Sequence, residues 1–141
     1  MTVMTPCATL RRRPLRLGIS VGDRLWMNSS AESVRVRAAD LRALTRVAAD
    51  VRDEYPETDI VVDIDALIAP SAHEAMSAAG SHHGDTLFYV GTPTGLAGLI
   101  ADIHSLGIAE GAVIHPVRND PDAIELLHQV VVPELHARMS R

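Results

Sequence analysis

An α/β fold with a parallel sheet is predicted for this chain of 141 residues. Short apolar runs alternate with stretches in which apolar residues recur every three or four positions, as strands alternate with amphipathic helices. Two of the helical stretches begin with a capping residue followed by proline, and two of the apolar runs end at a proline. Since parallel strands need helical crossovers, this order favours part of a β/α barrel or an open parallel sheet flanked by helices.

The first third of the chain is predicted to contain one strand and a long helix. Residues 1–9 lack periodicity and are expected to be disordered, and residues 11–20 are expected to be helical after Pro14. A buried strand is predicted near 24–28. Ser29-Ser30 is then expected to cap a helix that starts at Ala31 and ends before Pro56.

The middle of the chain is predicted to continue the alternation. A run rich in β-branched residues over 59–68, stopped by Pro70, predicts a strand. Residues 72–80 are expected to form a short helix, 80–84 an exposed loop, and 87–90 a short strand.

The last third has the clearest signals. Thr92 and Pro93 suit the cap and first residue of a helix, and Gly107 suits its left-handed C-terminal cap. The apolar run 111–115 predicts a buried strand that ends at Pro116, and Asp120-Pro121 starts a final helix. The buried stripes of these two helices are expected to consist of Leu96, Leu99, Ile100 and Ile103, and of Ile124, Leu127, Val130 and Val131.

This last third resembles the C-terminal end of the luciferase-like flavin-dependent monooxygenases. The residues that carry the resemblance are Gly91-Thr92-Pro93, the strand from Gly111 to His115, and Val131-Val132-Pro133-Glu134-Leu135. Upstream, the segment from Gly22 to Asn28 and the strand from Asp59 with His73-Glu74-Ala75 resemble earlier units in the same order. The resemblance implies a partial TIM-type β/α barrel made of its last few units.

Length limits what the resemblance implies, because a complete barrel takes roughly 250 residues. The chain can still form one α/β domain over 1–141. It is expected to self-associate, as a homodimer, or to combine with a chain that supplies the missing strands, since a partial barrel exposes sheet edges and apolar surface.

Composition excludes several classes of protein. The net charge of −5 argues against a nucleic-acid partner, and no apolar stretch has the length of a membrane helix. Cys7 is the only cysteine, and the arginine-rich start has no signal-peptide core after it, so a cytoplasmic location is expected. There is no Gly-x-Ser-x-Gly, phosphate-loop or dinucleotide motif.

Five residues at predicted strand ends are candidates for cofactor binding. Asn28, Ser29 and Ser30 combine two hydroxyls with a predicted helix N-terminus, which favours an anion such as a flavin phosphate, although a serine there can also serve only as a cap. His115 could face a ligand or bond a loop carbonyl. Arg118 could pair with a phosphate or be solvated.

Two groups of titratable residues allow alternative interpretations. Asp63 and Asp65 point to the same face of their strand, where they could share a proton or hold a divalent ion, or simply form a wetter face. His82 and His83 lack the spacing of zinc ligands, so no metal site is predicted.

The resemblance implies flavin mononucleotide, or a related flavin or deazaflavin, as cofactor of an oxidoreductase. The family's first strands and its flavin-phosphate loop have no counterpart here, so no catalytic residue is assigned. Two functions remain open. One is a flavin-dependent enzyme that needs a partner chain or a second copy, and the other is a non-catalytic remnant of the fold that binds a partner or a small ligand.

Overall fold

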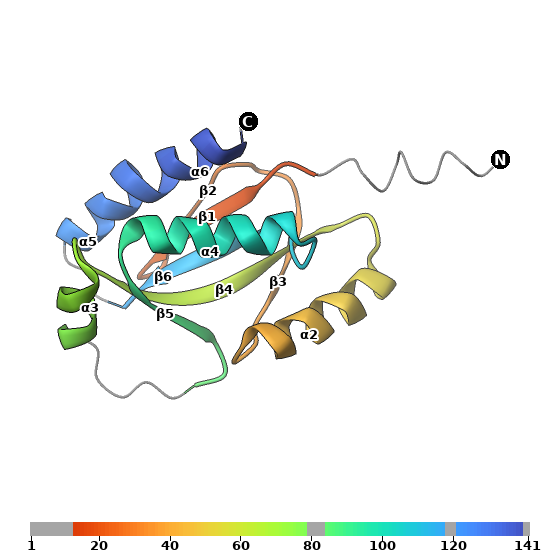
Figure 1. The fold of residues 1–141 in the computed structure, drawn as a ribbon. Helices are drawn as coiled ribbons and strands as arrows, with labels where there is room; N and C mark the ends of the chain where they lie inside the picture. The colour runs from red at the N-terminus through yellow and green to blue at the C-terminus, as the bar shows by residue number, and fades with distance from the viewer. Residues whose placement is uncertain (1–12, 79–83, 118–120, 140–141) are drawn as a thin grey trace.

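The computed structural model describes residues 13–78, 84–117 and 121–139. The expected disordered segment 1–9, most of the expected loop 80–84, and Arg118 therefore lie outside the described residues. The elements in chain order are β1 (Arg16–Val21), β2 (Arg24–Met27), β3 (Ser33–Val36), α2 (Leu41–Glu54), β4 (Asp59–Ile68), α3 (Ala72–Ala78), β5 (Leu87–Gly91), α4 (Pro93–Ser105), β6 (Gly111–Pro116), α5 (Pro121–Leu126), the π-helix η1 (Leu127–Val131) and α6 (Val132–Met139) (Figure 1).

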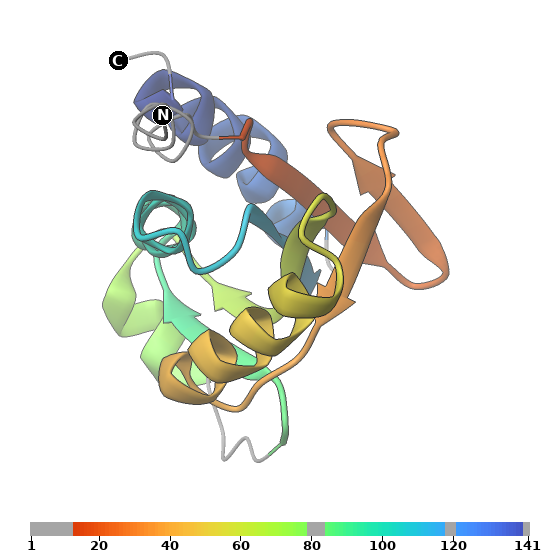
Figure 2. The same cartoon turned by 90° about the vertical axis from the view of Figure 1, so that its right-hand side faces the viewer.

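The sheet has the strand order β2-β1-β6-β4-β3. The pairs β1–β6, β6–β4 and β4–β3 are parallel, and β2 is antiparallel to β1. β5 pairs in parallel with the second half of β4, and β3 with the first half. The last strand thus lies against the first, as in a β/α barrel, and the sheet curls into a half-barrel flanked by helices (Figure 2). The predicted α/β fold class is confirmed.

One hydrophobic core joins the helices to the outer face of this sheet. Alternation along β4 directs Ile60, Val62, Ile64, Ala66 and Ile68 to that face, and all five are buried. The helices contribute buried residues of α2, α4, η1 and α6, namely Leu44, Ala48, Leu96, Ile100, Leu127, Val131 and Leu135. Among the described residues no helix is long and apolar enough to cross a membrane.

In the last third, α4 and β6 form as predicted, whereas the expected final helix is divided into α5, η1 and α6, and its expected start residue Asp120 lies outside the described residues. Thr92 accepts a hydrogen bond from the Gly95 N–H, and Pro93 follows it in the first turn of α4. Gly107 has a φ of 73° and ends the helix with two further bonds, Gly107 N–H to His104 and Ile108 N–H to Ile103. This is the double hydrogen bond of a Schellman cap.

The predictions for residues 11–40 are wrong in three places. Residues 16–21 form β1 instead of a helix, because Leu15, Leu17 and Ile19 alternate into the core. The strand predicted near 24–28 does form at 24–27, but it is an exposed antiparallel edge instead of a buried strand. It is joined to β1 by a two-residue turn at Gly22-Asp23, where Gly22 has a φ of 61°.

The third difference concerns the long helix. It begins at Leu41, and Asp40 is its N-cap, whose carboxylate accepts a bond from the Ala43 N–H at 2.8 Å. Residues 33–36 form β3 instead. Ser29 and Ser30 therefore do not precede a helix, and the anion site predicted from a helix N-terminus at that point does not form.

Candidate functional site

The inner face of the half-barrel is filled by side chains in three layers, as barrel interiors are. Strand registers define these layers. The lower layer consists of Arg35, Val61, Gly111 and Arg16, the middle layer of Asp63, Val113, Gly18 and Met27, and the upper layer of Phe88, Asp65 and His115. The upper layer lies toward the carboxyl ends of the parallel strands, where β/α folds place ligand sites.

Two glycines allow neighbouring atoms to approach closely on this face. A Cβ atom at Gly18 would collide with the Met27 sulfur, and one at Gly111 would collide with the Arg16 carbonyl. Gly18 thus makes room for the Met27 side chain, and Gly111 lets the backbones of β6 and β1 approach closely.

Asp63 is the centre of a charged cluster on this face and is only 3% exposed. Its Oδ1 accepts from Arg35 Nε at 3.1 Å, from Arg35 Nη2 at 2.8 Å and from His115 Nε2 at 3.0 Å. Its Oδ2 accepts from Arg37 Nε at 3.0 Å. These four donors satisfy a buried carboxylate, as burial of a charge requires.

The pKa of Asp63 reflects two opposing effects. Burial is the largest single influence and raises this pKa, because it disfavours the charged form. The hydrogen bonds from His115, Arg35 and Arg37 favour the charged form and together outweigh burial, so the pKa lies below its ordinary value. Asp63 is thus an ionised carboxylate that needs no proton shared with Asp65.

The ionised Asp63 also fixes the tautomer of His115. An unprotonated Nε2 would bring two acceptor atoms to 3.0 Å of each other, so Nε2 carries the proton and donates to Oδ1. The 3.2 Å contact between this Nε2 and Arg35 Nη2 then joins two donors and is not a hydrogen bond. In the neutral ring, Nδ1 is left as the atom that can accept a proton.

Arg37 connects the cluster to solvent. Its side chain is 60% exposed, and the Asp63 carboxylate raises its pKa, first by the hydrogen bond and then by its charge. Because Nε is the nitrogen that bonds Asp63, the guanidinium can offer its two terminal nitrogens to an incoming group. An anchored guanidinium of this kind suits a phosphate or carboxylate.

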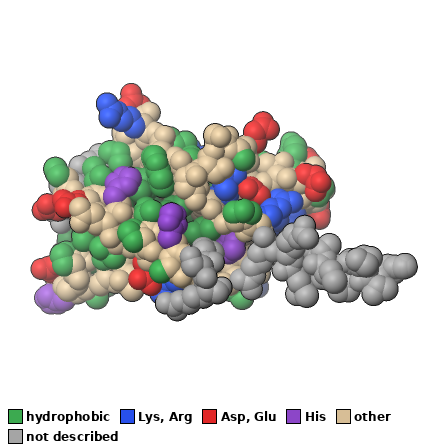
Figure 3. Space-filling model, turned by 90° about the horizontal axis from the view of Figure 1, so that it is seen from above, with side chains coloured by type: hydrophobic (Ala, Val, Ile, Leu, Met, Phe, Trp, Pro, Cys, Tyr) green, Lys and Arg blue, Asp and Glu red, His purple; other side chains and the backbone are tan. Residues whose placement is uncertain are grey.

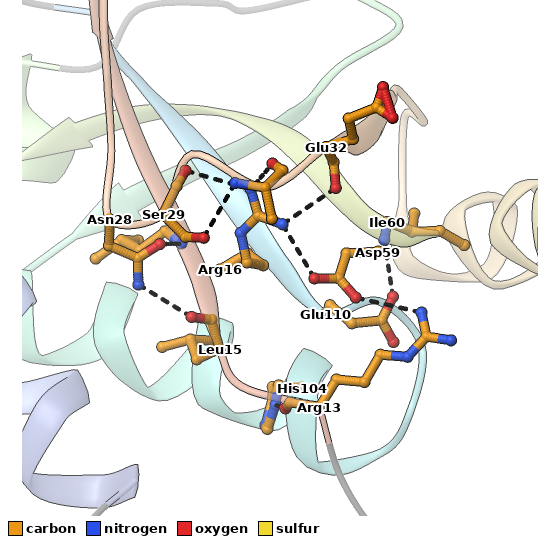
Figure 4. A network of polar contacts seen from close by, with 12 residues as sticks. Arg13, Leu15, Arg16, Asn28, Ser29, Glu32, Asp59, Ile60, His104 and Glu110 are labelled. Carbon is orange, nitrogen blue, oxygen red and sulfur yellow. Dashed lines mark hydrogen bonds and ion pairs between the residues drawn. The ribbon is translucent and has the colours of Figure 1, made fainter. Parts of the chain in front are cut away.

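A second polar network closes the opposite end of the half-barrel (Figure 4). Arg16 is 3% exposed and donates to Asp59 Oδ2 at 3.0 Å, to the Ala31 carbonyl at 2.6 Å and to the Glu32 carbonyl at 3.2 Å. It therefore ties the segment between β2 and β3 to the N-terminal end of β4. This network holds the fold together, although Arg16 Nε is buried without a hydrogen-bond partner among the described residues.

The predicted site residues Asn28 and Ser29 belong to this lower network. Asn28 Oδ1 accepts from the Leu17 N–H at 3.0 Å, and its Nδ2 donates to the Leu15 carbonyl at 3.0 Å, so its side chain pairs with β1. Ser29 Oγ accepts from the Ala31 N–H at 3.2 Å. Ser30 is exposed in the same segment.

The structure does not bring the predicted cofactor residues together. His115 lies in the upper layer, whereas Asn28, Ser29 and Ser30 lie at the N-terminal ends of the parallel strands. Arg118 is outside the described residues. The sequence interpretation missed Arg35, Arg37 and Phe88, and the signal that could have found the two arginines is the alternation of Val34, Val36 and Ala38 with polar residues.

A cavity of about 620 Å³ lies outside the inner face, at the carboxyl end of β4 between α3, α5 and η1. Its walls include Ile68, Pro70 and Leu126, and three acidic residues also line it. Like charges there oppose a phosphate, so this cavity does not suit the phosphate of a flavin. No group of three His, Cys, Asp or Glu residues that could hold a metal ion occurs among the described residues.

Comparison with known proteins supports the fold. No protein-family model and no curated protein matches the sequence. Among solved structures, the chain is similar to the long-chain alkane monooxygenase LadA, a luciferase-like monooxygenase, with a TM-score of 0.55 and 17% identity. The match covers 77% of this chain and 37% of the LadA chain. The resemblance predicted from sequence is thus supported as a likeness of fold.

Proposed function

We propose that this chain is a half-barrel relative of the luciferase-like flavin-dependent monooxygenases. It binds flavin mononucleotide, or a related flavin or deazaflavin, at the upper layer of its inner face. The observation that carries the proposal is Arg37, an exposed guanidinium just after the carboxyl end of β3 that is anchored on the buried Asp63 of the middle layer.

The upper layer lies next to the layer of Asp63, on which this guanidinium is anchored. This layer is one row across β5, β4 and β6 that consists of Phe88, Asp65 and His115. An aromatic ring and a histidine therefore lie on the same inner face as Asp63, which holds Arg37. Arg37 can hold a phosphate, Phe88 can contact a flavin ring, and Nδ1 of His115 can accept a proton. A bound flavin would supply the electron transfer.

Activity is proposed to require a second copy or another chain. The match covers 37% of the LadA chain, so this chain alone corresponds to less than half of that structure. In the open half-barrel one face of a bound flavin would remain in water. We therefore expect weak binding by the chain alone, with a Kd on the order of 1 mM.

Titration of flavin mononucleotide against riboflavin tests the proposal. Quenching of flavin fluorescence should show weaker binding of riboflavin, which lacks the phosphate. Arg37→Ala should weaken mononucleotide binding about tenfold and leave riboflavin binding unchanged. Arg46→Ala removes an exposed arginine from α2 as a matched control. Equal binding of both flavins, or no binding into the millimolar range, would contradict the proposal.

A non-catalytic remnant of the fold is the alternative, and the placement of aromatic rings favours it. Trp26 makes an edge contact with His128 of η1, and the Tyr89 hydroxyl donates to the Thr92 carbonyl. Among the described residues, the inner-face layers thus contain one aromatic side chain, that of Phe88. Flavin binding without any change in the rate at which oxygen reoxidises the reduced flavin would support this alternative.

A further inference from the structure

We propose that the cavity at the carboxyl end of β4 binds a small amphiphile with a cationic head and an apolar tail, that is, an alkylammonium compound. The cavity encloses about 620 Å³, which lies within the range of small-molecule sites. It lies outside the inner face on which flavin binding is proposed. The inference therefore does not depend on that function.

The walls of the cavity favour an apolar tail. Ile68, Ala69 and Pro70 form the end of β4 and the turn after it, and Ala123, Leu126 and Val130 face them from α5 and η1. Burial of apolar surface on both partners drives such binding. The carboxyl end of a parallel strand is also where α/β folds place ligands.

The charges of the cavity favour a cationic head. Glu74 of α3 and Asp122 and Glu125 of α5 line it, and none of the described lining residues is basic. Seen from above, the end of the molecule with α3 and α5, on the left, carries acidic side chains beside hydrophobic ones (Figure 3). Glu125 is held by a bond from Gln129 Nε2 at 3.0 Å, which fixes one of the three carboxylates.

The backbone next to the cavity is irregular. Gln129 and Val130 belong to η1, a π-helical turn in which the Val132 N–H donates to the Leu127 carbonyl. Single π-turns inside α-helices frequently occur at functional sites. Here the wider turn carries both an apolar wall residue and the partner of Glu125.

An NMR titration with three probes of equal chain length tests this proposal. Octylammonium should bind saturably and shift the amide signals of residues 68, 69 and 122–130. Octanol should bind more weakly, and octanoate should bind least because the carboxylates repel it. The preference for octylammonium should fall as salt is added, because salt screens exposed charges.

Two double variants separate charge from fold. Glu74→Gln with Glu125→Gln should weaken octylammonium binding about tenfold and leave octanol binding unchanged. Asp50→Asn with Glu57→Gln removes the same charge at exposed positions that do not line the cavity and should leave octylammonium affinity unchanged. Equal affinity for octylammonium and octanoate, shifts located elsewhere, no binding at millimolar probe, or equal loss in both variants would overturn the proposal.

Discussion

Asp63 of β4 accepts four hydrogen bonds from three side chains. These side chains belong to β3, to β6 on the other side of β4, and to the segment that follows β3. Replacing it by asparagine keeps its volume but removes the charge that Arg35, Arg37 and His115 surround. The two arginines are partly exposed and can turn toward water, so we expect a loss of about 2 kcal/mol rather than the 3–5 kcal/mol typical of a fully buried pair. Urea unfolding at pH 7 measures this loss, and an unchanged midpoint would contradict it.

The same carboxylate predicts a pH dependence. Its pKa is lower in the folded chain than the unfolded value of about 3.9, so the unfolded chain takes up this proton first as the pH falls. The stability that Asp63 contributes is therefore complete above that unfolded value and is lost as the pH falls below it. Unfolding between pH 2.5 and pH 7 should show a steeper acid loss for the native chain than for Asp63→Asn, and parallel curves would contradict this assignment.

Alanine substitutions at Gly111 and Gly98 are expected to have opposite effects on stability. A Cβ atom at Gly111 would collide with the Arg16 carbonyl, so Gly111→Ala must separate β6 from β1 and should cost about 2–3 kcal/mol. Gly98 lies inside α4, and a Cβ atom added there would have Arg138 Nη2 as its nearest neighbour outside the helix backbone, at 3.9 Å. Gly98→Ala should therefore stabilise the fold by about 0.5–1 kcal/mol. Thermal unfolding of both variants tests this, and shifts of the same sign would show that the two backbone environments are not as described.

At the scale of elements, α2 offers a direct test of where the helix begins. Asp40→Ala removes the cap that accepts from the Ala43 N–H and should lower the free energy of unfolding by about 1 kcal/mol. Ser30→Ala should change it by less than about 0.5 kcal/mol, because Ser30 is exposed and precedes no helix. If Ser30→Ala were the costlier variant, the helix would begin where the sequence alone suggested.

The elements that the sequence predicts well are those with local signals. The strands 59–68 and 111–116 are apolar runs ended by breakers, and α4 carries its own caps at Thr92 and Gly107. Local chemistry decides these boundaries, so no tertiary contact is needed to find them.

The secondary structure of region 11–40 is harder to predict because competing local signals favour helices. Leu15, Leu17, Ile19 and Val21 alternate as a strand requires, but the nearby arginines and Pro14 suggested a helix start. The serines at 29 and 30 likewise suggested a cap. These segments form strands because β1 pairs with β6 and β3 pairs with β4. Such pairing joins residues that are far apart in the chain.

The candidate site could also be predicted only in part, because its contacts depend on pairing between strands that are distant in the chain. That Asp63 and Asp65 share a face follows from alternation alone, and both do lie on the inner face. The partners of Asp63 could not be found once Arg35 and Arg37 were assigned to a helix. His115 was identified from its place at a strand end, whereas its bond to Asp63 depends on the register between β4 and β6.

At the scale of the whole molecule, the open sheet edge predicts self-association. β2 is an edge strand on which Leu25 and Trp26 are 48% and 39% exposed. We expect a homodimer at tens of micromolar by light scattering, and Trp26→Lys should shift it toward monomer. Leu106→Lys changes a residue that is 74% exposed after α4 and serves as control. A monodisperse monomer for the native chain would contradict the prediction.

We propose above that the inner face around Asp63 is the ligand face of this half-barrel. Amide shift mapping with flavin mononucleotide tests it most directly, because it locates the ligand as well as detecting it. We expect saturable shifts at Arg37, Asp63, Phe88 and His115, which are lost in Arg37→Ala, and none at Asn28–Ser30. Shifts confined to Asn28–Ser30, or none at all at millimolar flavin, would contradict it.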